Sequence, residues 1–240
     1  MCGLCGDGLN RRQLLFAGLA APLALGPFDK EGLVEPVLRL QPQSGPRRVA
    51  VTLDCCPGHF DMRIAPVLVE RRIPATIFVT AVWMRMNPEG LAYFLQHKDI
   101  FTLENHGARH LPPILGTRRV YGLEVAGSWP AIQAEINGGA LAITQATGRV
   151  PQWYRGAAGL YTPSMVPRIE ALGVRVAGYS LNSDEGAGLP AAIVQARIEA
   201  ARDGDVIEGH INQPKRASGA GIAAGLAALQ QSGAQFARLS

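Results

Sequence analysis

The chain has 240 residues, of which 48% are hydrophobic, and this length suffices for one domain with a sizeable core. Its formal net charge is only +4, and its arginines occur in doublets without interleaved aromatic residues. That pattern gives little support to a nucleic-acid-binding protein. The 28 glycines and 17 prolines are typical of an α/β protein with many turns. We therefore expect a single α/β domain and no nucleic-acid partner.

Residues 1–28 have the features of an export signal. Arg11 and Arg12 precede a short apolar run at 14–25, and small residues and a proline follow. The adjacent arginines favour the twin-arginine type, with a plain secretory signal or an uncleaved anchor as the alternative. We expect an exported protein, periplasmic or extracellular, that has no stable membrane insertion once the signal is removed.

The four cysteines fall into two pairs. Cys2 and Cys5 precede the paired arginines and would leave with the signal, so only Cys55 and Cys56 remain in the exported protein. Residues 29–47 carry several prolines and no clear period, which predicts a linker. The catalytic domain is expected over 48–240.

Strands and helices are expected to alternate along this domain. The strands are predicted at 49–54, 74–80, 100–103, 151–155, 174–179 and 205–208, and a final helix and strand close the chain. The helices are predicted at 61–71, with Asp61 as its N-cap, and at 88–97, 129–147, 164–172 and 189–202. Such alternation implies a parallel sheet with right-handed crossovers. Six or seven units favour a short barrel over a small open sheet.

Polar side chains follow the carboxyl ends of four predicted strands. The stretch at 48–58 is an apolar run that ends abruptly in a carboxylate, two thiols and a Pro-Gly turn. A barrel brings such strand ends together on one face, which predicts a hydrolytic metal site. Each group also has a plainer interpretation: a turn cap, a surface histidine pair, an ordinary ion pair or a core histidine. The groups are Asp54 with Cys55 and Cys56, His106 with His110, Arg155, and His210.

In order and spacing, five motifs make the sequence resemble the polysaccharide deacetylase family of metal-dependent carbohydrate esterases. They are Thr-Leu-Asp-Cys-Cys-Pro at 52–57, His-Gly-Ala-Arg-His at 106–110, Arg-Gly-Ala-Ala at 155–158, Asn-Ser-Asp at 182–184 and Ile-Glu-Gly-His at 207–210. The resemblance covers roughly residues 48–215. It implies a distorted (β/α) barrel of about seven strands in a single domain.

The resemblance also implies roles for the motif residues. Asp54 would be the general base, kept ionised by Arg155. His210 would be the general acid, oriented by Asp184. His106 and His110 would be metal ligands, and Cys55, at the position of a metal-binding aspartate in the family, would be the third.

A thiolate beside two imidazoles favours Zn²⁺ as the divalent metal. The alternative is that Cys55 is a small buried hydrophobic residue and that the metal is held weakly or is absent. The family's Pro and aromatic residue after Arg155 and its Trp after Asp184 are missing here, which changes the substrate groove.

We therefore expect an exported zinc-dependent hydrolase that removes N- or O-linked acetyl groups from a cell-envelope or extracellular polysaccharide. Its partner would be the acetylated glycan substrate. Two alternatives stay open. One is a catalytically weak glycan-binding protein with a degenerate metal site, and the other is an amidohydrolase that acts on a non-sugar amide.

Overall fold

The computed structural model describes residues 24–28 and 32–239. Most of the expected export signal, residues 1–23, lies outside the described residues, and export stays a prediction. The strands are β1 (Ala24–Phe28), β2 (Val34–Val37), β3 (Arg48–Cys55), β4 (Ala75–Val79), β5 (Phe101–Asn105), β6 (Arg119–Val120), β7 (Leu123–Glu124), β8 (Trp153–Tyr154), β9 (Arg175–Val176), β10 (Leu181–Asn182), β11 (Val206–His210) and β12 (Gln235–Ala237). The helices are α1 (Ala65–Glu70), α2 (Ala81–Met86), α3 (Pro88–Gln96), α4 (Trp129–Thr147), α5 (Met165–Glu170), α6 (Ala191–Glu199) and α7 (Ser218–Gln231), with a 3₁₀ turn, η1, at Ala157–Gly159.

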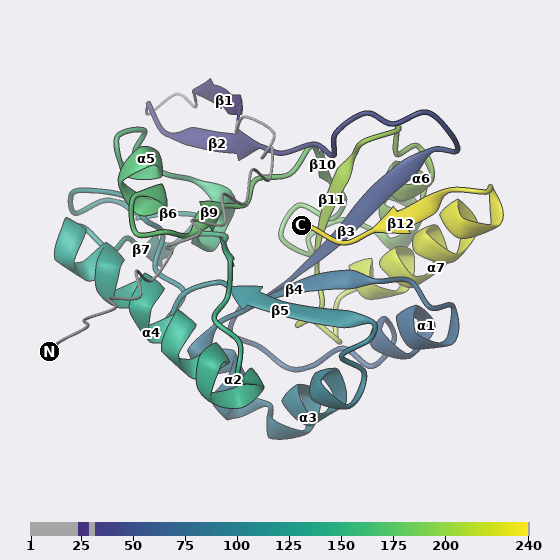
Figure 1. Cartoon of the computed structure of the whole chain (residues 1–240), viewed down its shortest axis with the longest axis horizontal. Coiled ribbons are helices and arrows are strands. Elements are labelled where there is room, and N and C mark those ends of the chain that lie inside the picture. Colours follow the sequence, from purple (N-terminus) through teal and green to yellow (C-terminus); the bar gives the residue numbers. More distant parts are fainter. Residues whose placement is uncertain (1–23, 29–31, 240) are drawn as a thin grey trace, which may run out of the picture.

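The central sheet is parallel and curls into an incomplete barrel (Figure 1). Its strand order is β10-β11-β3-β4-β5-β8-β9, and β12 pairs in parallel with the start of β3. No pairing joins β9 to β10 in the part of the chain that the structure describes, so the two ends of this order stay open. The predicted distorted barrel of about seven strands is confirmed.

Alternating side chains along each strand divide the sheet into an outer and an inner face. On β3, Val49, Val51 and Leu53 belong to the large core beneath the outer helices. Ala50, on the opposite face, belongs to a smaller core inside the curl, together with Phe78 of β4. The inner face carries the polar residues of the site.

Part of the expected linker, residues 33–40, packs against the barrel, whereas residues 41–46 are exposed. Val34 is fully buried and exchanges backbone hydrogen bonds with Tyr161. The backbone around β2 then lies against residues 178–179, where a Cβ on Gly178 would come within 2.0 Å of the Pro36 carbonyl oxygen. Only glycine fits at that contact, so this segment packs closely against the connection between β9 and β10.

The helices agree with the predicted ranges to different degrees. Helix α4 has the predicted bounds, whereas α1 starts at Ala65 rather than at Asp61. The Asp61 carboxylate accepts hydrogen bonds from the backbone and guanidinium of Arg63, so residues 61–64 form a turn before the helix. Among the helices of the described residues, none is both long and apolar enough to span a membrane.

Candidate active site and metal centre

The candidate site lies where the parallel strands end, on the inner side of the curl. Asp54 is on β3, and His106 directly follows β5. Arg155 directly follows β8, and His210 is the last residue of β11, in register with Asp54. Parallel strands end at one edge of their sheet, so residues far apart in the sequence meet there. The structure brings all of these predicted residues together.

Asp54 is held by a fully buried arginine. Arg155 donates from Nη1 to Asp54 Oδ1 at 2.8 Å and from Nη2 to Thr52 Oγ1 at 2.9 Å. Its guanidinium also lies over the Phe78 ring, 4.2 Å from the centroid. Burial raises the pKa of Asp54, but the charges of Arg155, His106 and His210 and the hydrogen bond from Arg155 together outweigh that effect, and the pKa is lowered. Asp54 therefore stays ionised. Its other oxygen, Oδ2, lies 3.7 Å from His106 Nε2.

His210 is held from two sides by Asp184. One oxygen of Asp184 lies 2.9 Å from His210 Nδ1, and the other accepts the His210 backbone N–H at 2.8 Å. Burial lowers the pKa of His210, but nearby negative charges, first that of Glu208, raise it well above its ordinary value. The carboxylate of Asp184 thus fixes the Nδ1 edge of the ring and leaves Nε2 as the other titratable position.

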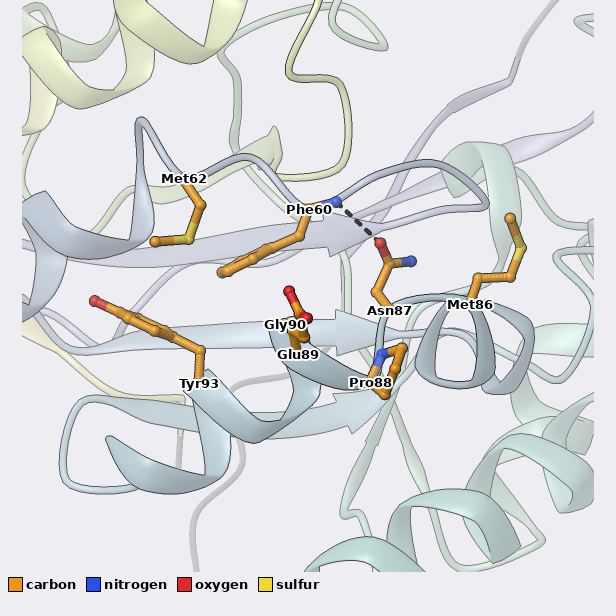
Figure 2. A pocket seen from close by; sticks show the side chains of 8 residues that line it. All are labelled: Phe60, Met62, Met86, Asn87, Pro88, Glu89, Gly90 and Tyr93. Atoms are coloured by element: carbon orange, nitrogen blue, oxygen red, sulfur yellow. Dashed lines mark hydrogen bonds between the residues drawn. The ribbon is translucent and has the colours of Figure 1, made fainter.

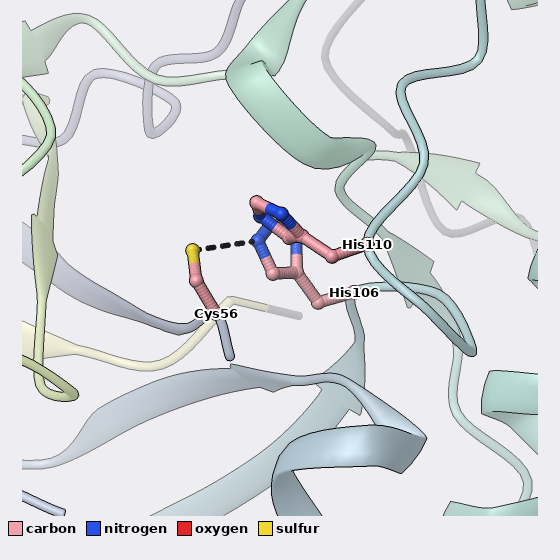
Figure 3. A group of neighbouring side chains, drawn as sticks. All are labelled: Cys56, His106 and His110. Carbon is pink, nitrogen blue, oxygen red and sulfur yellow. Dashed lines mark hydrogen bonds between the residues drawn. The ribbon is translucent and has the colours of Figure 1, made fainter. Parts of the chain in front are cut away.

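Three further side chains form a compact set of metal donors (Figure 3). The donor atoms of Cys56, His106 and His110 all lie within 4.8 Å of one another, and Cys56 Sγ is 3.5 Å from His106 Nε2. His106 Nδ1 lies 2.7 Å from the carbonyl oxygen of Arg155. A carbonyl only accepts, so Nδ1 carries the proton, and in the neutral ring Nε2 has the free lone pair.

The donor set fits a bound metal ion. His110 Nε2 is buried without a hydrogen-bond partner, which is costly unless something binds it. Burial raises the pKa of the Cys56 thiol, but the neighbouring His110, His210 and His106 outweigh this and bring it well below its ordinary value. One thiolate with two imidazoles is a combination that binds Zn²⁺ and leaves a fourth position open.

The structure corrects the prediction for the third ligand from Cys55 to Cys56. Cys55 is fully buried in the outer core with Val79 and Leu53, on the helix side of the sheet. Burial raises the pKa of its thiol well above the ordinary value. Side chains alternate along a strand, so Cys56 falls on the same side as Asp54 and Cys55 on the other. This alternation was the sequence signal that could have identified Cys56.

Glu208 is a site residue that the sequence reasoning missed. It is 3% exposed, and its Oε1 lies 3.3 Å from His210 Nδ1, while Oε2 has no hydrogen-bond partner. Burial raises its pKa to about 8, and the nearby carboxylates of Asp184 and Asp54 act in the same direction. A carboxylate two residues before His210 on the same strand shares its face, and this spacing was the available signal.

A separate recess of about 630 Å³ lies on the outer side of the sheet (Figure 2). It contains none of the site residues described above. Phe60 forms one wall, and its ring packs edge-on against Phe94, 5.1 Å between centroids. The lining residues are Phe60, Met62, Met86, Asn87, Pro88, Glu89, Gly90 and Tyr93.

Solved structures of similar fold include deacetylases and a pseudoenzyme. Peptidoglycan deacetylase PdaC from Bacillus subtilis is 21% identical, with a TM-score of 0.66 over 81% of this chain and 89% of that one. BA3943, a CE4 family pseudoenzyme from Bacillus anthracis, is 15% identical, with a TM-score of 0.64 over 82% of this chain. This chain spans 65% of the BA3943 structure. A BA3943 mutant with restored enzymatic activity is 16% identical, with a TM-score of 0.66 over 89% of this chain and 78% of that one.

Comparison of the sequence with curated proteins found no match. The family model described as polysaccharide deacetylase matches residues 41–177, which include Asp54, Cys56, His106, His110 and Arg155. This match covers more than half of the chain and agrees with the parallel barrel and with the placement of the site at its strand ends. The chain therefore belongs to the polysaccharide deacetylase family.

Proposed function

We propose that this chain is an exported, metal-dependent deacetylase that removes acetyl groups from a cell-envelope or extracellular glycan. The observation that carries the proposal is the arrangement of two oriented acid–base residues around one donor set. Asp54 is fixed by Arg155, His210 is fixed by Asp184, and Cys56, His106 and His110 lie beside them.

Asp54 is suited to act as the general base. Arg155 occupies Oδ1, so Oδ2 is the oxygen that takes a proton from the attacking water. The lowered pKa keeps the carboxylate ionised at neutral pH. Positioned general bases of this kind typically contribute about 10²–10⁴-fold to a rate.

His210 is suited to act as the general acid. Its Nδ1 is held by Asp184, and Nε2 carries the proton that the leaving amine or hydroxyl requires. Its raised pKa keeps the ring protonated at neutral pH. The base and the acid are therefore in opposite protonation states at one pH, as hydrolysis of an amide or ester requires.

Cys56, His106 and His110 would hold a divalent cation, with Zn²⁺ favoured by the sulfur donor. A zinc ion bound there supplies a Lewis acid that polarises the acyl carbonyl and activates water. A thiolate donates more charge to the ion than a carboxylate does, so this metal would be a weaker Lewis acid than one held by oxygen and nitrogen.

The test is acetate release from a panel of N- and O-acetylated glycans by protein with measured metal content, with and without added Zn²⁺. Asp54→Asn serves as the control for contaminating hydrolases. Metal-dependent release that the variant lacks supports the proposal. Metal-loaded wild-type protein that releases no acetate from any member of the panel, peptidoglycan fragments included, contradicts it.

A catalytically weak glycan-binding protein is the second candidate function. The observation that favours it is that the donor set contains the thiol of Cys56, which would make the metal a weaker Lewis acid. A pseudoenzyme, BA3943, has a similar fold. Glycan binding that persists in metal-free protein, without turnover after zinc loading, would select this candidate.

A further inference from the structure

The carboxylate of Glu135 contacts the loop that joins His106 to His110. Glu135 belongs to α4 and is 2% exposed. Its Oε2 accepts the backbone N–H groups of Arg109 at 2.9 Å and of Leu111 at 3.5 Å, and its Oε1 accepts Arg109 Nε at 3.2 Å. Neither the acid–base pair nor the donor set includes Glu135. A buried carboxylate is costly unless hydrogen bonds and charge compensate it, and here the loop supplies both.

His110 has a backbone conformation that residues with a side chain normally avoid. Its φ is 73°, in the left-handed region, which is unfavourable for a residue with a Cβ. The two N–H groups that Glu135 accepts belong to the residues on either side of His110. N–H groups that converge around a left-handed residue form a concave site for an anion. The Glu135 carboxylate fills that site and so stabilises the conformation of His110.

The loop is also confined by its fit between α4 and α2. A Cβ on Gly107, whose φ is 90°, would lie 2.7 Å from Glu135 Oε2, so only glycine fits there. On the other side, the carbonyl groups of residues 107 and 108 accept the first two backbone N–H groups of α2, at 3.0 Å each. Helix α2 therefore holds the carbonyl groups of the loop, and Glu135 holds its N–H groups.

The two histidines of the donor set are oriented in different ways. His106 is fixed through its ring, because its Nδ1 lies 2.7 Å from the Arg155 carbonyl oxygen. The ring of His110 lies 4.9 Å from that of His106 between centroids, at 63° (Figure 3). Its Nε2 is buried and has no hydrogen-bond partner among the described residues. The direction of the His110 ring therefore depends on its backbone, which Glu135 holds.

We propose that Glu135 is a positioning residue of the metal site. By binding the N–H groups on both sides of His110, it keeps the backbone in the conformation that places the His110 ring beside Cys56 and His106. This inference rests on the proposed metal site and adds a residue of α4 to it. Groups that orient metal ligands in this way typically contribute about 10–100-fold to metal affinity.

The test measures the zinc affinity of the full chain by competition with a chromophoric chelator, for wild type, Glu135→Gln and Glu135→Ala. The Gln variant keeps the volume, but it has one accepting oxygen, and its amide nitrogen would face N–H groups. Glu104→Gln is the matched control. Glu104 is also a buried carboxylate that binds one arginine and two backbone N–H groups, but those belong to residues 152 and 153, outside the loop. Circular dichroism and a thermal melt establish that each variant is folded.

We expect both Glu135 variants to bind zinc about 10–100-fold more weakly than wild type. Glu104→Gln should melt at a lower temperature and keep the zinc affinity of wild type. If Glu135→Ala does not fold, the milder Glu135→Gln decides the test. A folded Glu135→Gln protein with the zinc affinity of wild type overturns the inference.

A double-mutant cycle separates the positioning of His110 from general support of the fold. If Glu135 acts through His110, adding Glu135→Gln to His110→Ala should weaken zinc binding no further, because the ligand that Glu135 positions is already gone. If the double variant loses the full effect of Glu135→Gln in addition to that of His110→Ala, Glu135 does not act through His110, and the inference is overturned.

Failure of the proposed function gives a different result from failure of this inference. Wild-type protein that binds zinc but releases no acetate contradicts the proposed function. In that case, weaker zinc binding by Glu135→Gln that is coupled to His110 still supports the role of Glu135. If wild type releases acetate and the Glu135 variants keep its zinc affinity, the proposed function stands and the role of Glu135 fails.

Discussion

Arg155 donates a 2.8 Å hydrogen bond to Asp54 across the inside of the curled sheet, from the end of β8 to the end of β3. The strands β4 and β5 lie between these two in the sheet order, so the pair does not join neighbouring strands. It forms only because the sheet curls enough for opposite walls to face each other. Curvature of the sheet therefore creates the environment that keeps Asp54 ionised.

Replacing Asp54 with Asn should remove activity without removing the metal. Asn keeps the shape and can still contact Arg155, but it cannot take a proton from water. We expect kcat to fall by about 10²–10⁴-fold. Metal content, measured on the same preparation by elemental analysis, should equal that of wild type. An Asp54→Asn protein that retains wild-type kcat would mean that another group is the base.

Replacing Arg155 with Lys should shift the acid side of the pH profile. The guanidinium of Arg155 donates to Asp54, Thr52 and the Gly178 carbonyl in a planar arrangement that lysine cannot reproduce. The pKa of Asp54 would then rise, so activity should be lost at a higher pH as the solution is acidified. The measurement is kcat/KM against pH.

The stability of the Arg155→Lys protein provides a separate check. The folded-state pKa of Asp54 is lowered, so its contribution to stability is present above the unfolded-state pKa and is lost as the pH falls through the folded-state value. The variant should lose this contribution at a higher pH than wild type. An unchanged acid limb in both activity and unfolding would show that Arg155 does not control Asp54.

The sequence was sufficient to predict the barrel and the grouping of Asp54, His106, Arg155 and His210, because strand ends in a parallel sheet must share an edge. It did not identify which of two adjacent thiols faces inward. A family alignment matches positions, whereas the orientation of a side chain depends on the strand's alternation and on the backbone at its end. Glu208 was missed for a related reason: its neighbours at 206–207 are apolar, and its two-residue spacing from His210, confirmed by the register with β3, is what shows that it faces the site.

The two thiols give the sharpest test of the donor set. Cys56→Ala should lose bound metal, since two imidazoles alone hold zinc poorly. Cys55→Ala should keep the metal and lose only about 1 kcal/mol of unfolding free energy, because it removes one small buried group from the outer core. Elemental analysis and a denaturant titration measure these two effects. Loss of metal in the Cys55 variant, with retention in the Cys56 variant, would restore Cys55 as the ligand.

An aspartate at each thiol position extends that comparison. Cys56→Asp should keep the metal, because a carboxylate is also a zinc ligand and the position faces the two histidines. Its activity should equal or exceed that of wild type, since oxygen donates less charge to the ion. Cys55→Asp would place an unpaired carboxylate in the apolar outer core and should be strongly destabilised. Equal melting temperatures of the two aspartate variants would contradict the orientation of the strand end.

The pH dependence of stability should carry a contribution from Glu208 with a sign opposite to that of Asp54. The folded-state pKa of Glu208 is raised to about 8, above the ordinary value for a glutamate. Between roughly pH 4.5 and pH 8 the folded protein therefore binds a proton that the unfolded chain has released, and stability falls as the pH rises through this window. Glu208→Gln removes that dependence. Across the window, the free energy of unfolding of the variant should therefore rise relative to that of wild type by an amount on the order of a few kcal/mol. Guanidinium unfolding at pH 5 and pH 8 measures it, with Glu104→Gln as the control that is destabilised at both values. If wild type and Glu208→Gln lose stability in parallel between these two pH values, Glu208 does not hold a proton in the folded state.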